Sequence, residues 1–122
     1  MTKIFEDYFT DIQAKMISGC LDYVGEVAEK IYIYGSIEGS VISFDAFYKV
    51  KDNLLYGHEI NNFLSESKKI DDSSDRELTL LRSGIANLED IKELCEKYNM
   101  ETPTEIKIEY NVLHSSMKAD YK

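Results

Sequence analysis

Apolar side chains near the start of the chain recur at steps of three and four residues. They are Ile4, Phe5, Tyr8, Phe9, Ile12, Met16 and Cys20. Charged and amide side chains fill the positions between them, so the spacing predicts an amphipathic helix over residues 3–19. Gly19 weakens the end of this helix, and residues 21–27 either extend it or form a turn.

The period of the pattern then changes from about 3.6 residues to two. Residues 30–34 alternate Ile with Tyr and predict a strand, and residues 35–39 are typical of a hairpin loop. Residues 40–50 alternate again and predict a second strand. One of its faces would carry Ile42, Phe44, Ala46 and Tyr48, and the other Val41, Ser43, Asp45, Phe47 and Lys49. A tight turn over residues 51–53 and a shorter third strand over residues 54–59 complete a predicted antiparallel meander.

A second helical stripe follows a polar segment over residues 61–74, which we expect to be a loop with or without a short helix. The stripe consists of Leu78, Leu81, Ile85, Leu88, Ile91, Leu94, Cys95 and Tyr98. Ser74 or Asp75 is the candidate N-cap. Gly84 is a candidate break that would divide the segment into two helices, and Thr102–Pro103 is predicted to stop it.

The last part of the chain returns to a period of two. Residues 104–112 alternate apolar with charged side chains and predict a strand. A turn over residues 114–116 leads to a final strand over residues 117–121. The order α-β-β-β-α-β-β predicts one α+β domain over residues 1–122, in which helices cover one face of a five-stranded antiparallel sheet.

The charge of the chain narrows the classes of partner. Its 122 residues include 23 Asp and Glu against 14 Lys and Arg, which gives a net charge of -9. Such a surface repels nucleic acid and attracts basic proteins. The alternative is that the negative charge has no partner and only prevents aggregation of a soluble domain. No stretch approaches the roughly 18 apolar residues of a membrane span, and no secretion signal is evident, so we expect a cytoplasmic protein without a membrane partner.

The residues suited to catalysis are few and scattered. His58 and His114 are the only histidines, and Cys20 and Cys95 are the only cysteines. His58 and Glu59 are neighbours in a predicted strand, so their side chains point to opposite faces. Nucleophile-elbow, phosphate-loop and zinc-protease motifs do not occur. We expect two reduced, partly buried thiols, and no enzymatic activity, cofactor or metal.

Carboxylates and tyrosines fall on strand ends and on the strand positions that face away from the predicted helices. We therefore expect a flat acidic sheet face with interleaved tyrosines, which would suit a basic protein or resemble the phosphates that a nuclease recognises. The alternative is that some of these tyrosines belong to the core. The candidate partner-binding residues are Tyr32, Tyr34, Glu38, Asp45, Tyr48, Tyr56, Glu59, Glu109 and Asp120.

Three parts of the chain carry a family resemblance. They are I-Y-I-Y with S-V-I-S-F-D-A-F-Y-K-V in residues 31–50, L-L-Y-G-H-E-I in residues 54–60, and T-P-T-E-I-K-I-E-Y with the later K-A-D-Y in residues 102–121. Together they resemble the YezG-type immunity family, whose members are antitoxins for secreted bacterial toxins of the LXG kind. The family order is also helix, three strands, helix, two strands. The chain departs from the family in lacking Trp and in the segment over residues 75–100.

The resemblance implies an immunity protein of a polymorphic toxin system. Such a protein binds and neutralises a cognate toxin domain, and the resemblance makes a nuclease the leading target. The acidic charge agrees with a basic toxin as partner. The alternative is a small-ligand-binding or regulatory α+β module with a pocket between the helices and the sheet.

Overall fold

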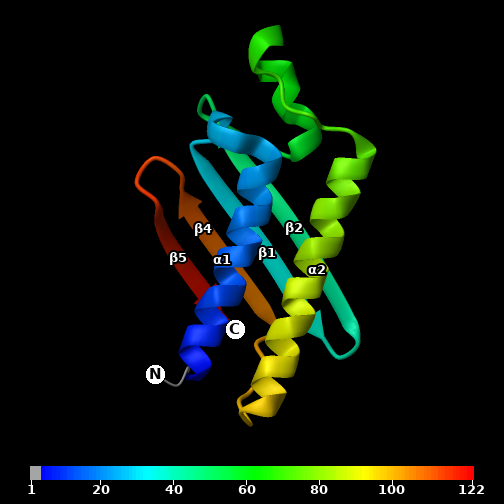
Figure 1. Ribbon diagram of the computed structural model, residues 1–122, viewed down its shortest axis with the longest axis vertical. Coiled ribbons are helices and arrows are strands. Elements are labelled where there is room, and N and C mark those ends of the chain that lie inside the picture. Colours follow the sequence, from blue (N-terminus) through cyan, green and yellow to red (C-terminus); the bar gives the residue numbers. More distant parts are fainter. Residues whose placement is uncertain (1–3) are drawn as a thin grey trace.

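The computed structural model describes residues 4–122 and has the predicted α+β order of elements (Figure 1). The main elements are α1 (Phe5–Val24), β1 (Lys30–Glu38), β2 (Val41–Val50), β3 (Asn53–Leu55), α2 (Ser74–Lys97), β4 (Glu105–Asn111) and β5 (Ser116–Tyr121). Three short 3-10 helices are η1 (Gly25–Val27), η2 (Gly57–Phe63) and η3 (Glu66–Lys68). Residue 3, where the first helix was predicted to begin, lies outside the described residues.

The five strands form one antiparallel sheet in the order β3-β2-β1-β4-β5. Strand β1 is central, and its Ile33 pairs with Ala46 of β2 on one side and with Ile108 of β4 on the other. Both long helices lie on the same face of the sheet (Figure 1). The fold is therefore two-layered, and no helix within residues 4–122 lies over the other face of the sheet.

The core lies between the helices and the sheet. Ile31 of β1 and Ile106 of β4 are fully buried there, in one core cluster with Leu88 and Ile91 of α2. Burial of such a side chain is worth about 1.5–3 kcal/mol relative to exposure, so the alternating isoleucines hold the strands against the helices. The predicted faces of residues 40–50 and 104–112 are confirmed, because alternate positions of both segments enter this core.

Glycines within the two helices mark close packing. A Cβ built on Gly19 would lie 3.5 Å from Leu80 Cδ1, so α1 passes near α2 at this point and continues to Val24. A Cβ on Gly84 would lie 2.5 Å from the ring of Phe44. The predicted break at Gly84 is wrong: α2 is continuous, and the missing side chain makes room for the Phe44 ring.

The ends of α2 also differ from the prediction. Its N-cap is Ser73, one residue before the predicted candidates. Its C-terminal end is set by Asn99, which takes a left-handed φ of 56°, while the Met100 N–H donates to the Cys95 carbonyl at 2.8 Å. This pattern is a Schellman motif. The helix therefore ends before it reaches Pro103.

The third strand is shorter than predicted and stops at Leu55. The Glu59 carboxylate accepts a hydrogen bond from the Tyr56 N–H at 2.9 Å, which bends this segment into η2. Gly57 lies against the ring of Tyr23, where a Cβ would approach within 2.8 Å. His58 and Glu59 consequently belong to a 3-10 helix, and the prediction of a strand for residues 56–59 is wrong.

The turns are tight and have the expected backbone. Strand β1 runs on to Glu38, past the predicted loop start at Gly35, and only Gly39 and Ser40 connect it to β2. Gly39 takes a φ of 62°. Lys51 and Asp52 connect β2 to β3, and their φ angles of 49° and 64° are those of a type I′ turn.

Candidate functional site: the open face of the sheet

The uncovered face of the sheet has aromatic rings at its centre. The register places Phe47 of β2 and Glu109 of β4 on either side of Tyr32, and Asp45 and Lys107 on either side of Tyr34. A shallow depression of about 370 Å³ follows these rows across to Lys118 and Asp120 of β5. We use the name open face for the outward positions of β2, β1, β4 and β5.

Phe47 is the central residue that sequence reasoning missed. Its ring lies 4.7 Å from the Tyr56 ring, centroid to centroid, and its register partner in β1 is Tyr32. The three rings thus form an aromatic row from the start of η2 to the middle of the sheet. The alternation of residues 40–50 had already assigned Phe47 to the outer face, and that was the available signal.

One hydrogen bond on the open face joins β1 to β4. The Tyr34 hydroxyl donates to the Glu105 carboxylate at 3.0 Å, and Lys122 Nζ lies 3.6 Å from the same carboxylate. The hydroxyl, followed by the nearby lysines, lowers the pKa of Glu105, while the bond to Glu105 raises the pKa of Tyr34. These side chains are therefore held in a defined arrangement.

The open face is mixed in charge, and the prediction of an acidic face is wrong. Its carboxylates are Glu38, Asp45, Glu105, Glu109 and Asp120. Its lysines are Lys30, Lys49, Lys107 and Lys118. Opposite charges are neighbours at several positions: Lys107 pairs with Asp120 and Glu109 with Lys118 in the register, and Lys30 Nζ lies 3.8 Å from the Glu109 carboxylate. Much of the negative charge lies elsewhere, for example on α1, where Glu6, Asp7, Asp11 and Asp22 outnumber the single basic residue of the helix, Lys15.

The structure separates the predicted partner-binding residues into three groups. Those on the open face are Tyr32, Tyr34, Glu38, Asp45, Glu109 and Asp120. Tyr56 and Glu59 lie beyond β3, where Tyr56 extends the aromatic row and Glu59 folds back onto the backbone. Tyr48 is 1% exposed, because even-numbered positions of β2 face the helices, and its placement on an interface is therefore a correction to the prediction.

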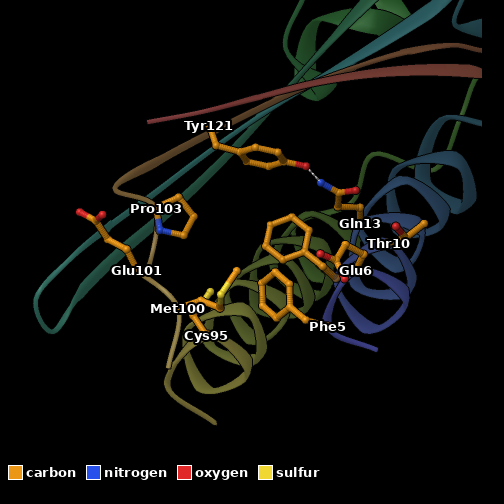
Figure 2. A pocket seen from close by; sticks show the side chains of 10 residues that line it. Phe5, Glu6, Thr10, Gln13, Cys95, Met100, Glu101, Pro103 and Tyr121 are labelled. Atoms are coloured by element: carbon orange, nitrogen blue, oxygen red, sulfur yellow. Dashed lines mark hydrogen bonds between the residues drawn. The ribbon is translucent and has the colours of Figure 1, made fainter. Parts of the chain in front are cut away.

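A second hollow of about 510 Å³ lies at one end of the helix layer (Figure 2). We call it the end cavity. It is walled mainly by the apolar side chains of Phe5, Phe9, Met100 and Pro103, together with the ring of Tyr121. Figure 2 shows Tyr121 reaching in from the sheet side, where its hydroxyl accepts a hydrogen bond from the amide of buried Gln13.

Groups suited to catalysis remain apart. Within residues 4–122, no three His, Cys, Asp or Glu side chains are arranged to hold a metal ion. The His58 ring stacks on Tyr56, and His114 lies in the turn between β4 and β5. Cys20 and Cys95 are buried free thiols, and burial raises the pKa of Cys20 to about 12. None of the helices in this described part is long and apolar enough to span a bilayer.

No protein-family model matches the chain. No curated protein matches it either. A function for the chain must therefore be argued from the open face and the end cavity themselves.

Proposed function

We propose that this protein is a cytoplasmic immunity protein that binds and neutralises a cognate secreted toxin, a nuclease of a polymorphic toxin system. The observation that carries the proposal is the open face, where an aromatic row lies within a surround of paired charges. Specific protein interfaces have the same anatomy, with buried aromatic anchors inside a polar rim. The resemblance of residues 31–50 and 102–121 to immunity proteins supports the same reading.

In this proposal the open face and the rest of the surface have different tasks. The net charge of -9 attracts a basic toxin from a distance and raises the association rate. The mixed lysines and carboxylates of the open face select the partner at short range. Tyr32, Phe47 and Tyr56 then exclude water and slow dissociation. The protein acts by occupying the toxin surface, so inhibition is stoichiometric.

The decisive experiment is co-expression with the toxin encoded beside this chain. Wild-type protein should protect cells, and Phe47→Ala should weaken binding by about 1–3 kcal/mol, mainly through faster dissociation. Tyr8→Ala is the matched control, because Tyr8 is a partly exposed aromatic residue of α1 on the opposite side. Absence of any binding or protection by the wild-type protein would refute the proposal.

Charge reversal separates attraction at a distance from recognition at the interface. Glu38, Asp45 and Glu109 on the open face are replaced together by Lys, and a control variant replaces Glu89, Glu93 and Glu96 on the exposed side of α2. Both variants change net charge equally, so both should slow association at low salt. Only the open-face variant should also speed dissociation. Equal dissociation rates would remove the open face from the interface.

Binding of a small apolar molecule is a second candidate function, and the end cavity favours it. Its volume of about 510 Å³ and its apolar lining with few polar groups are usual for ligand sites. Met100→Trp would narrow the cavity and introduce the only Trp of the chain. A neutral naphthylamine probe should bind the wild-type protein and lose affinity in this variant. Equal binding by both proteins would remove the cavity as its site.

A further inference from the structure

The edge of β2 offers unpaired backbone groups. Strand β3 pairs only with residues 48–50 of β2, so residues 41–47 have a strand neighbour on one side alone. The Lys49 carbonyl accepts a hydrogen bond from the Glu29 N–H at 2.7 Å, on the β1 side. Because antiparallel positions alternate, Ile42, Phe44 and Ala46 direct their N–H and C=O groups outward. Within the described chain, no hydrogen bond joins these outward groups to another residue.

This edge lacks most of the features that usually prevent strand addition. Native sheets protect their edges with Lys, Pro, bulges or very short strands. Residues 41–47 read V-I-S-F-D-A-F and contain neither Lys nor Pro, and their register with β1 is continuous. The opposite edge, β5, carries Lys118. The β2 edge is therefore the better template for an added strand.

A groove runs beside the same edge. A hollow of about 190 Å³ lies between β2 and α2, and it is lined by Phe44, Ala46, Leu80 and Leu81 among others. Leu81 is 40% exposed, and Leu78, one helical turn earlier, is 42% exposed. A strand added to β2 would direct alternate side chains into this groove and cover Leu81.

We propose that the β2 edge binds an extended segment of the toxin as a sixth strand, by β-augmentation. This inference rests on the proposed immunity function. The backbone groups of Ile42, Phe44 and Ala46 would supply the hydrogen bonds, and the groove would take apolar side chains at every second position.

The charges around the edge define the incoming segment further. Asp45 lies on the edge strand and Glu77 lines the groove, in a protein whose net charge is -9. A Lys or Arg of the added strand would pair favourably with Asp45 across the ladder. A second copy of this chain would bring the same negative charge and the same acidic edge. The segment is therefore basic and alternates apolar with polar residues over about five to six positions.

A pair of proline variants tests the inference. Ala46→Pro removes an outward N–H from β2, and Ala119→Pro removes the equivalent outward N–H from β5, where the Lys122 N–H bonds to Glu105 on the inner side. Proline is tolerated at edge positions whose N–H faces solvent, so both variants should fold, which circular dichroism and thermal melting check. The purified, catalytically inactivated toxin domain encoded beside this chain serves as the probe.

The expected result is asymmetric. Ala46→Pro should lower toxin affinity at least tenfold, and Ala119→Pro should change it less than twofold. In the wild-type protein, amide exchange at Ile42, Phe44 and Ala46 should be fast alone and slow in the complex, and this measurement decides the matter if Ala46→Pro does not fold. Unchanged affinity of a folded Ala46→Pro, or unchanged exchange, would overturn the inference while leaving the immunity function intact. Slow amide exchange at these three residues already in the isolated protein, together with a dimeric mass, would assign the edge to a second copy. Failure of the wild-type protein to bind the toxin would instead refute the proposed function.

Discussion

Ile106 and Lys107 are neighbours in β4, yet they belong to two different environments. Ile106 is fully buried beneath the helices, whereas Lys107 stands in a row with Tyr34 and Asp120 on the open face. We call the face under α1 and α2 the covered face. Because the interior is close-packed, the side chains there must fit the available space in volume and shape. On the open face, the charges of neighbouring side chains determine which residues are favourable at each position. One face can therefore change with a partner while the other keeps the fold.

The largest effect should follow removal of volume from the covered face. Ile106→Ala should lower the free energy of unfolding by about 2–5 kcal/mol, because it leaves a cavity under the helices. Lys107→Ala, one position along, should change it by less than about 0.5 kcal/mol. Urea denaturation followed by circular dichroism measures both values. Similar losses for the two variants would contradict the division between the faces.

Adding a methyl group to each of the two helix glycines should change the stability in opposite directions. Gly84→Ala should lower the free energy of unfolding by about 1–3 kcal/mol, because the new methyl group meets the Phe44 ring. Gly19→Ala should instead raise it by about 0.5–1 kcal/mol, because its methyl group meets Leu80 at an ordinary contact distance and alanine favours helix. Thermal unfolding of the two variants provides the test, and a change of the same sign in both would count against this packing.

Burial beneath the helices should also lower the reactivity of the two cysteine thiols. Cys20 is fully buried, and burial raises its pKa to about 12, so at pH 8 the unreactive thiol predominates. Burial likewise raises the pKa of Cys95, but Cys95 lines the end cavity. In a disulfide-exchange assay of the folded protein, Cys95 should react first and Cys20 only after unfolding. The Cys95→Ser variant identifies the slow thiol, and rapid reaction of this variant would contradict the burial of Cys20.

The smallest effect concerns a single hydrogen bond on the open face. Tyr34→Phe removes the hydroxyl that holds the pKa of Glu105 below its ordinary value of 4.5, so this pKa should rise. A lowered carboxyl pKa gives stability that is present above about pH 4.5 and is lost as the pH falls through the folded-state value. The variant should therefore lose less stability in acid. Carboxyl carbon shifts report the Glu105 titration, with Tyr32→Phe as the control that should leave it unchanged.

Local periodicity was enough to predict most of the fold. The alternation in residues 40–50 and 104–112 chooses a face at each position, so these strands and their buried sides could be predicted without tertiary information. Gly84 could not be interpreted in this way, because the reason for a glycine there is the Phe44 ring, which comes from a distant part of the chain. The end of β3 was also missed, because the Glu59 carboxylate bonds back to the Tyr56 N–H and Gly57 packs against the distant Tyr23.

The sequence pattern located the open face but did not indicate its mixed charge. The open face could be located from alternation, and so could Phe47. Its charge was misjudged because the carboxylates were considered without the lysines on the same alternating positions, such as Lys107 and Lys118. Tyr48 was misplaced although the same alternation had grouped it with Phe44 on the apolar face. The β2 edge depends on where β3 stops, which the sequence pattern did not show.

The central position of β1 has a consequence for the folding pathway. Strands β1, β2 and β3 are joined by two-residue turns, and β4 and β5 by a short one, so both groups can form from local contacts. The ladder between β1 and β4 is different, because it brings Ile33 to Ile108 and must close a loop that contains α2. The entropy of loop closure is therefore concentrated in a single ladder in the middle of the sheet. The speed of folding should depend on that ladder far more than on either edge of the sheet.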